Sequence, residues 1–183
     1  MKTPDYFFHL EDDFYLRALK ESDLDGRWAQ WLNDPEVTRF QGKGIYPNSL
    51  EGQRRYYQSV IDSRTDVVLA VVDRSSDRHI GNVGLHQIDY VSRTAILGIV
   101  IGEKDAWGRG IGARAWRAIT AYGFSVLNLH KICATMMEGN EKSLKCALAS
   151  GYEVEGRQKK QHFKNGTYLD LIHVGVLREN WKG

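Results

Sequence analysis

The stretch Ile99-Val100-Ile101-Gly102-Glu103-Lys104-Asp105-Ala106-Trp107-Gly108-Arg109-Gly110-Ile111-Gly112-Ala113 decides the fold of this chain. It begins as an apolar strand, continues through a loop with glycines at 108, 110 and 112, and opens an amphipathic helix. The first amides of a helix have no acceptor within the helix, and the helix dipole places partial positive charge there. Glycines remove the side chains that would keep a phosphate away from such amides. The stretch therefore predicts a strand, an anion-binding loop and a helix, in that order.

Outward from this stretch, strand and helix patterns alternate along the chain. Apolar runs separated by short polar turns predict about seven strands, near residues 14–19, 67–73, 80–89, 95–101, 131–136, 152–160 and 167–177. Helix N-terminal signals start at Ser22, Asn48, Gly110 and Asn140. Asn165-Gly166 is a strong hairpin signal. Because short connections join antiparallel strands, the predicted fold class is α/β with a mixed, mostly antiparallel central sheet.

Length and composition are typical of one globular domain. The 183 residues are 42% hydrophobic and 26% charged, with only three prolines. No repeat or flexible linker divides them, so a single domain over 1–183 is expected. The longest aliphatic run, 67–72, is far shorter than a membrane span. Two cysteines, Cys133 and Cys146, lack CxxC spacing and favour reduced thiols and a cytoplasmic location.

The net charge is small, but the charged residues are distributed unevenly along the chain. A net charge of +2 is too low for a nucleic-acid binder, which needs a dense basic stripe. Residues 1–90 contain 11 Lys and Arg against 15 Asp and Glu, whereas residues 91–183 contain 14 against 8. The basic half carries the glycine loop and suits a phosphate ligand, while the acidic half suits an amine-bearing partner. Neither a nucleic acid nor a membrane is expected as a partner.

Three classes of ligand use a glycine loop of this kind. A P-loop ends in Gly-Lys-Ser/Thr, but this loop ends Gly-Ile-Gly-Ala. A dinucleotide fold is formally allowed, because Gly108, Gly110 and Ala113 fit GxGxxA. That fold also needs an acidic residue about 20 positions on, and none occurs in the next strand before Glu138. The pyrophosphate of coenzyme A fits best.

The segment Trp107-Gly108-Arg109-Gly110-Ile111-Gly112 resembles the pyrophosphate loop of the GNAT superfamily of acetyl-CoA-dependent N-acetyltransferases, Gln/Arg-x-x-Gly-x-Gly/Ala, with Trp107 at the Gln/Arg position. The segments 140–143 and 150–156 are similar to its second conserved block. Trp107 with Ser143, and the ending 163–170, resemble the branch of ribosomal-protein N-terminal, polyamine and amino-sugar acetyltransferases. The resemblance covers nearly the whole chain. It implies one N-acetyltransferase domain with helices on both faces of the sheet.

This resemblance also implies which residues bind the acetyl donor. Acetyl-CoA is the expected acetyl donor, with no metal, and the coenzyme core is expected over about 67–183. In the family, the strand before the loop separates from its neighbour and the pantetheine arm enters the gap. The residues implied in coenzyme binding are Ile99, Val100 and Ile101 along the arm, the amides of Arg109, Gly110, Ile111, Gly112 and Ala113 at the pyrophosphate, and Asn140 opposite the arm. Arg114 is a further candidate for the phosphates.

The acceptor is expected to be a primary amine: an amino sugar, a protein N-terminus or another small amine. It would lie against the N-terminal part, about 1–66, whose aromatic residues include Trp28 and Tyr56. An alkylammonium must lose a proton before it attacks a thioester. No spacing suggests a Ser-His or Cys-His pair, so we expect direct attack in a ternary complex.

The catalytic residues are harder to predict, because two family positions are altered. Ala147 replaces the family's common tyrosine acid, and Ile96 replaces a carboxylate on the strand before the loop. The resemblance leaves Ser143 as the candidate acid and His162 as the candidate base. Alternative bases are His86, Asp89 and Glu138.

Two other classes of function stay open at this point. The altered residues at 147 and 96 also fit a non-catalytic acyl-CoA-binding module. A dinucleotide-binding enzyme is the weaker alternative. No heptad or repeat indicates an oligomeric state.

Overall fold

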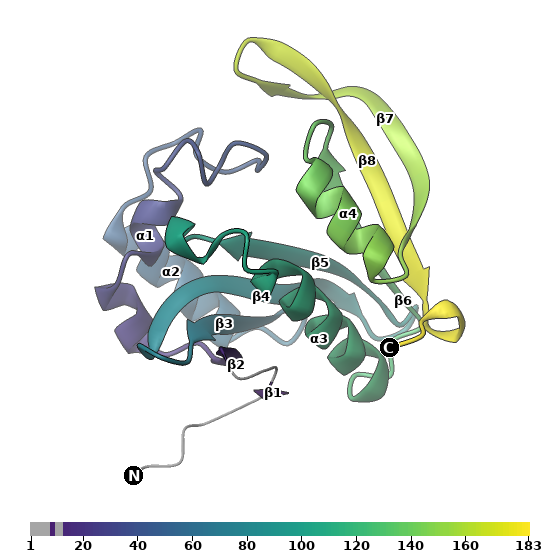
Figure 1. Cartoon of the computed structure of the whole chain (residues 1–183), viewed down its shortest axis with the longest axis horizontal. Helices are drawn as coiled ribbons and strands as arrows, with labels where there is room; N and C mark the ends of the chain where they lie inside the picture. Colours follow the sequence, from purple (N-terminus) through teal and green to yellow (C-terminus); the bar gives the residue numbers. More distant parts are fainter. Residues whose placement is uncertain (1–7, 10–12) are drawn as a thin grey trace.

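The computed structural model describes residues 8–9 and 13–183, which form one eight-stranded sheet (Figure 1). The strands are β1 (Phe8–His9), β2 (Phe14–Ala18), β3 (Val67–Asp73), β4 (Arg78–Asp89), β5 (Thr94–Ile101), β6 (Lys131–Met137), β7 (Glu153–Lys164) and β8 (Thr167–Leu177). Their order across the sheet is β1-β2-β3-β4-β5-β6-β8-β7. All neighbours are antiparallel except β5 and β6, which are parallel. The mixed, mostly antiparallel sheet is confirmed, with the two-residue β1 in addition to the expected strands.

Helices cover both faces of this sheet. They are η1 (Glu21–Asp25), α1 (Trp28–Trp31), α2 (Leu50–Ile61), η2 (Lys104–Ala106), α3 (Ile111–Ser125), α4 (Glu141–Ala149) and η3 (Arg178–Asn180). Figure 1 shows α3 and α4 on one side of the sheet and α1 and α2 on the other. Two buried clusters match this arrangement: Ile119 of α3 packs with Leu85 of β4, and Trp28 of α1 packs with Val72 of β3. The expected helices on both faces are confirmed.

The caps and the turn predicted at helix and strand ends are present in the structure. Asn140 precedes α4, and its Oδ1 accepts the backbone N–H of Ser143 at 3.3 Å. Gly151 follows the helix with φ of +81°, the left-handed conformation expected of a C-terminal cap. Asn165 and Gly166 join β7 to β8 with φ of 51° and 80°, as a tight hairpin requires.

The helix predicted to start at Ser22 is interrupted. Residues 21–25 form η1, an extended Gly26 follows, and α1 begins only at Trp28. The Asp23 carboxylate accepts hydrogen bonds from both guanidinium nitrogens of Arg17, at 2.8 and 2.6 Å, and from the backbone N–H of Lys20, at 2.8 Å. Its oxygens are therefore engaged by β2 and the preceding turn, and this contact between neighbouring segments competes with the local helix signal.

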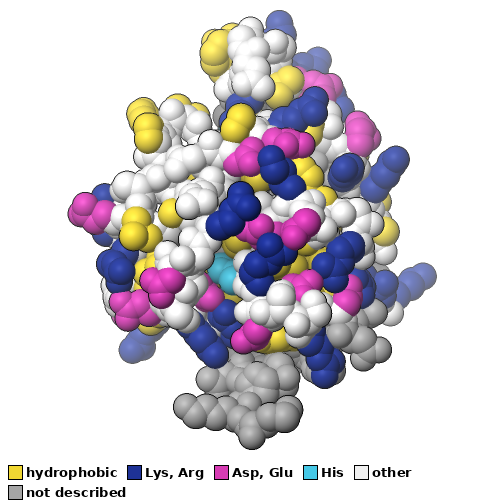
Figure 2. Space-filling model, turned by 60° about the vertical axis from the view of Figure 1, so that its left-hand side comes forward, with side chains coloured by type: hydrophobic (Ala, Val, Ile, Leu, Met, Phe, Trp, Pro, Cys, Tyr) yellow, Lys and Arg dark blue, Asp and Glu magenta, His cyan; other side chains and the backbone are white. Residues whose placement is uncertain are grey.

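The surface carries charges of both signs. On the face shown in Figure 2, basic and acidic side chains are interspersed without a continuous basic area. In the described part of the chain, no helix is long and apolar enough to cross a membrane.

The parallel pair β5 and β6 separates after three residues. Thr94, Ala95 and Ile96 pair with Lys131, Ile132 and Cys133. Beyond that point β5 pairs only with β4, as far as Ile101, and β6 pairs only with β8, as far as Met137. One edge of β5 therefore faces a gap, as the family resemblance predicted.

A close contact fixes the end of β5 to α1. Gly102 lies against the indole of Trp31, so a Cβ at position 102 would overlap the ring. The Trp31 Nε1–H donates to Glu103 Oε1 at 2.7 Å, and both side chains are buried. Only glycine fits between the strand end and this indole.

We expect Gly102→Ala to lower the free energy of unfolding by at least about 2 kcal/mol, because the new methyl group overpacks against Trp31. Urea denaturation measures this loss. Gly156→Ala is the matched control, since a Cβ at position 156 would meet no described atom within 4 Å. Equal stability of the two variants would contradict the contact.

Candidate active site

The glycine loop presents an open main-chain surface at the start of α3. Gly108 and Gly110 have φ of 80° and 73°, and Gly110 precedes the helix in the left-handed conformation. A Cβ at either position would meet no described atom within 4 Å, and at Gly112 it would meet only Ile101 Cγ1 at 3.8 Å. The N–H groups of Ile111, Gly112 and Ala113 are the first three of the helix, so they have no acceptor within it. The loop can therefore receive a phosphate against bare backbone, which fits a pyrophosphate.

Trp107 ties this loop to the strand before it. Its Nε1–H donates to the Ile101 carbonyl at 2.8 Å, and its ring packs against the cluster formed with α1. From the sequence, main-chain groups of Ile99 to Ile101 are expected to pair with the arm. The Gly102 N–H donates to the Ile80 carbonyl at 2.9 Å, so the alternation along the strand turns the main-chain groups of Val100 towards Asn82 of β4 and those of Ile99 towards the unpaired edge. Because the Ile101 carbonyl is engaged by the indole, Ile99 is the best placed of the three for that role.

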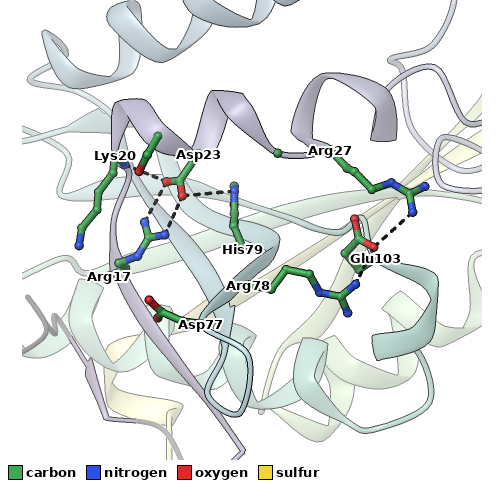
Figure 3. Close-up of a pocket in the computed structure, with 10 residues that line it drawn as sticks. Arg17, Lys20, Asp23, Arg27, Asp77, Arg78, His79 and Glu103 are labelled. Atoms are coloured by element: carbon green, nitrogen blue, oxygen red, sulfur yellow. Dashed lines mark hydrogen bonds and ion pairs between the residues drawn. The ribbon is translucent and has the colours of Figure 1, made fainter.

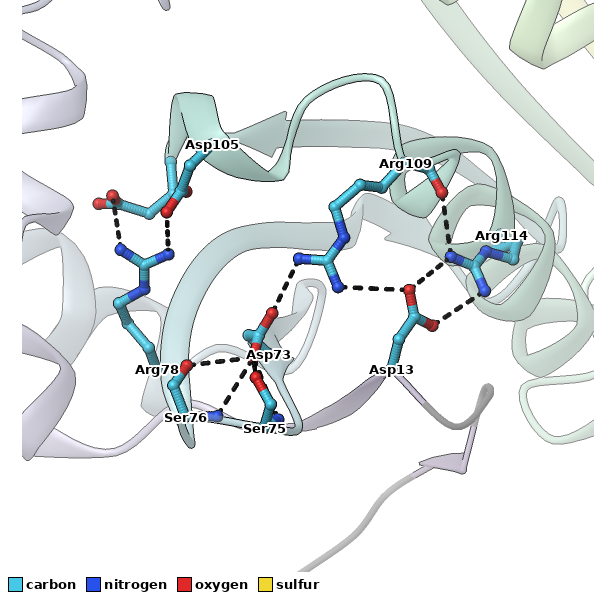
Figure 4. A network of polar contacts seen from close by, with 9 residues as sticks. Asp13, Asp73, Ser75, Ser76, Arg78, Asp105, Arg109 and Arg114 are labelled. Atoms are coloured by element: carbon cyan, nitrogen blue, oxygen red, sulfur yellow. Dashed lines mark hydrogen bonds and ion pairs between the residues drawn. The ribbon is translucent and has the colours of Figure 1, made fainter.

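The arginines of the loop are bound by carboxylates from the neighbouring strands (Figure 4). Arg109 donates to Asp73 at 2.9 Å, and Arg114 donates to both oxygens of Asp13 at 3.0 Å. Arg114 also stacks on the ring of Phe14, 4.7 Å from its centroid. The suggested contact of the Arg114 side chain with the phosphates would require these bonds to break. The backbone of the loop, rather than its arginine side chains, is what the structure offers to the ligand.

The network also shifts the pKa of Asp73. Hydrogen bonds from Ser75 contribute most, and those from Arg109 and Ser76 add to them against the opposing effect of burial. Together they hold the pKa of this carboxyl well below its ordinary value. Asp73 therefore anchors the glycine loop to the end of β3 as a carboxylate.

A pocket of about 210 Å³ lies between α1, α2 and strands β4 and β5. We call it the β4–β5 pocket. Trp28 and Tyr56 line its helix side, Asn82 comes from β4, and Ile99 and Val100 come from β5. The last two belong to the part of β5 that has lost contact with β6. The pocket therefore reaches the strand along which the pantetheine arm is expected.

His86 is the titratable side chain of β4 in this pocket. Its Nδ1 lies 2.9 Å from Asp66 Oδ1, and a Cβ at Gly98 would meet the imidazole at 3.2 Å. His86 pairs directly across the strands with Ile96, so the two side chains share one face of the sheet. The imidazole therefore lies on the same face as the family's strand carboxylate, whose position Ile96 occupies.

Asp66 is held in its charged form beside this imidazole. Burial would raise its pKa, but hydrogen bonds from Ser63, at 2.8 Å, and from His86 lower it below its ordinary value. A carboxylate bound to Nδ1–H orients the ring and leaves Nε2 free to accept a proton.

The predicted acid and base lie elsewhere. Ser143 is in the first turn of α4, where Asn140 caps it, and His162 is on β7 opposite Leu169 of β8. None of Ser143, Asn140 and His162 lines the β4–β5 pocket. Ala147 is fully buried in the core, so no proton donor comes from the family's tyrosine position.

The alternative carboxylates are engaged in local contacts. Asp89 accepts the backbone N–H groups of Val91 and Ser92 at 2.8 and 2.9 Å. Glu138 accepts from Arg157 at 3.0 Å. Burial raises the pKa of both Cys133 and Cys146, and neither cysteine forms a disulfide. Of the bases considered from the sequence, His86 is the one that reaches the pocket.

A second, larger pocket of about 320 Å³ lies beside η1 and the start of β4 (Figure 3). Most of its charges are paired with one another: Arg17 binds Asp23 at 2.6 Å, and Glu103 lies 3.4 Å from Arg78 and 3.7 Å from Arg27. No residue of β5 and none of residues 107–113 lines it. The smaller pocket is therefore the better candidate for chemistry.

Comparison with known proteins agrees with this geometry. Residues 13–153 match the family model described as an acetyltransferase (GNAT) domain, so the chain belongs to the GNAT family. It is an N-acetyltransferase, and acetyl-CoA is the donor that the family uses.

Relatives named N-acetyltransferases align over most of the chain. The chain is 29% identical to spermidine N(1)-acetyltransferase of Escherichia coli K12, over 91% of this chain and 87% of that protein. It is 27% identical to the uncharacterized N-acetyltransferase p20 of Bacillus licheniformis, over 92% and 94%. The crystal structure of spermidine N-acetyltransferase from Vibrio cholerae in complex with CoA and spermine superposes with a TM-score of 0.85 at 26% identity, covering 93% of this chain and 98% of that one. The predicted family and branch are confirmed.

Sequence reasoning missed several residues of the pocket. Gln41 and Lys43 lie in an irregular loop without periodicity, and Asn82 stands within an apolar strand. Asp66 is 20 positions from His86, so only the pairing of β3 with β4 brings them together. The one available signal was the concentration of aromatic residues, of which Trp28 and Tyr56 do line the pocket.

We expect Gly112→Glu to abolish binding of acetyl-CoA, because the new carboxylate would face the phosphates at the helix N-terminus. The fold should survive, since the nearest atom to a Cβ at Gly112 is 3.8 Å away. Thermal stabilisation by acetyl-CoA measures binding, with Gly156→Glu as the control. Unchanged affinity in folded Gly112→Glu would refute the loop assignment.

The Asp73 anchor should show in the pH dependence of stability. The folded-state pKa of Asp73 lies below its unfolded value, so its stabilising effect is present above about pH 4 and is lost as pH falls further. Asp73→Asn should lower the free energy of unfolding at pH 7 by about 1–3 kcal/mol, and the deficit should shrink below pH 4. Urea denaturation across pH tests this, with exposed Asp25→Asn as the control. A deficit independent of pH would argue against the anchor.

Proposed function

We propose that this chain transfers the acetyl group of acetyl-CoA to a primary amine by direct attack in a ternary complex. The observation that carries the proposal is the β4–β5 pocket, in which a His86–Asp66 pair faces the unpaired part of β5. That strand leads directly into the glycine loop. A proton acceptor on β4, an unpaired edge of β5 for the arm and a phosphate site after β5 would therefore lie next to one another.

The donor side is formed by main-chain groups. The pyrophosphate would be held by the backbone amides of Arg109, Gly110, Ile111, Gly112 and Ala113. The open main chain of the loop supports this assignment. The main-chain groups of Ile99, with the remaining polar group of Ile101, would pair with the arm, and Val100 would contribute its side chain to the pocket. Asn140, which caps α4, is proposed to face the arm from the β6 side.

The proton path begins at His86. Its Nε2 would take a proton from the acceptor ammonium, while Asp66 holds the ring and stabilises the imidazolium that forms. The amine nitrogen then bonds to the thioester carbon, and a main-chain amide near Ile99 stabilises the oxyanion. The carbon–sulfur bond breaks as the tetrahedral intermediate collapses and the nitrogen loses its second proton. Ser143 is proposed to donate its hydroxyl proton to the departing thiolate and to be reprotonated by the proton that the nitrogen loses, which leaves the amide, the thiol of coenzyme A and the imidazolium of His86.

The acceptor side belongs to the N-terminal part of the chain, about 1–66. Trp28, Leu32, Gln41, Lys43 and Tyr56 all line the pocket, which supports this division from a coenzyme core over about 67–183. The relatives named spermidine acetyltransferases support a small amine as the acceptor class, and an amino sugar or a protein N-terminus is chemically equivalent at the nitrogen. Two free thiols and an acetyl-CoA donor support a cytoplasmic location.

Thiol release from acetyl-CoA with a panel of amino sugars, polyamines and peptides tests the proposed activity. Release that depends on an added amine supports it. Binding of acetyl-CoA without release across the panel would favour the non-catalytic module instead.

Replacing His86 and His162 in turn distinguishes between these two candidate bases. We expect His86→Ala to lower kcat/KM by about 100-fold or more, because general-base catalysis contributes on that scale. His162→Ala is the matched comparison, with an expected loss of less than about threefold, because His162 does not line the pocket. The activity remaining in His86→Ala should rise with pH, as more of the amine becomes neutral without a base. A large loss only in His162→Ala would restore the assignment made from sequence.

A further inference from the structure

The β4–β5 pocket has an unusual charge for a site that takes amines. Its titratable lining consists of Lys43, Tyr56 and His86, and no carboxylate lines it. Asp66 lies behind His86 and is engaged by that ring. An acceptor therefore meets one fixed positive charge in this pocket and no accessible negative one.

Lys43 is held in place within the pocket. Its Nζ lies 4.8 Å from the centroid of the Tyr56 ring, a cation–π contact. Among the described residues, no carboxylate forms an ion pair with Lys43. Partial desolvation lowers its pKa, while the residue stays exposed at the mouth of the pocket. An anionic group on the ligand would supply the counter-ion that no described carboxylate provides.

The loop that carries Lys43 is fixed from the opposite side of the pocket. Lys164, at the end of β7, donates to the carbonyls of Gln41 and Lys43 at 3.0 and 3.2 Å. The β7–β8 hairpin therefore positions the loop, and Lys164 adds a second cation near it. The position of Lys43 does not depend on the loop alone.

The carboxylates nearest along the chain lie outside this pocket. Asp34 and Glu36 follow α1, and both bind Lys104, at 3.0 and 2.9 Å. A hydrogen bond from Lys104 lowers the pKa of Asp34, in agreement with a stable pair. Neither carboxylate lines the β4–β5 pocket, so neither faces an acceptor bound there.

We propose that the acceptor is a primary amine that also carries an anionic group, a carboxylate or a phosphate ester, and that Lys43 binds this group. The inference rests on the proposed acetyl transfer and narrows its acceptor. The anion would meet Lys43 while the amine meets His86, so the two charges orient the acceptor. A polycation such as spermidine would bring like charge to Lys43 without a carboxylate to compensate. The Lys43 charge also favours the neutral, nucleophilic form of a nearby amine.

Matched acceptor pairs test this specificity. The phosphate arm compares glucosamine 6-phosphate with glucosamine, and the carboxylate arm compares 4-aminobutanoate with 4-aminobutanamide. We expect kcat/KM for the anionic member of at least one pair to exceed that of its neutral partner by about 10-fold, and that of spermidine by more. The arm that shows the preference identifies the anion. Because the contact is ionic, the preference should fall as salt concentration rises.

Variants of Lys43 then link the preference to this side chain. Lys43→Met should lower kcat/KM for the anionic acceptor about 10-fold towards that of its neutral partner, and Lys43→Arg should retain the preference. Lys43→Glu should shift the preference towards spermidine. Lys20→Met is the control, because Lys20 lines the other pocket. Thermal unfolding and acetyl-CoA binding of each variant verify the fold.

The possible results separate the two proposals. If spermidine is preferred and Lys43→Met leaves that preference intact, the anionic acceptor is refuted while acetyl transfer stands. If no amine releases thiol, acetyl transfer itself fails and the inference fails with it.

Discussion

The separation of β5 from β6 is the constraint on which the site depends. The two strands share three residue pairs, after which β6 continues with β8 and β5 continues with β4. Backbone N–H and C=O groups at an unpaired strand edge need partners, and an extended ligand can supply them. The glycine loop lies at the end of this edge, and the β4–β5 pocket reaches the same edge at Ile99 and Val100. The separation therefore leaves one strand edge next to both the glycine loop and the pocket.

Features set by short segments could be predicted from the sequence. Gly110 in the left-handed conformation, the Asn140 cap and the Asn165-Gly166 turn all depend on a few neighbouring residues. The alternation of strands and helices follows from the same kind of local pattern. Family, fold class and glycine loop could be predicted for this reason. The first helix could not, because the partner of Asp23 is Arg17 on β2 and the interruption at Gly26 accompanies that contact.

The catalytic face was harder to predict because its members come from separate elements. His86 was one of several possible bases, and nothing near it in the sequence indicates that Asp66 lies 2.9 Å away. The pairing of β4 with β5 also shows what the sequence could not: His86 lies directly opposite Ile96. The loss of the family carboxylate at Ile96 is thus accompanied by an imidazole on the neighbouring strand and the same face.

Charge summed over half of the chain does not give the charge of a binding surface. The acidic balance of residues 1–90 suggested an amine-bearing partner, yet the structure pairs several of those carboxylates with arginines and lysines. Asp13 and Asp73 hold Arg114 and Arg109 on the donor side, and Asp34 holds Lys104. Because coulombic effects on a small ligand are strongest at contact and are screened beyond about 8–10 Å, the unpaired Lys43 outweighs the more distant acidic excess. The same acidic half that implied a cationic partner therefore contributes a cation, Lys43, to the lining of the β4–β5 pocket.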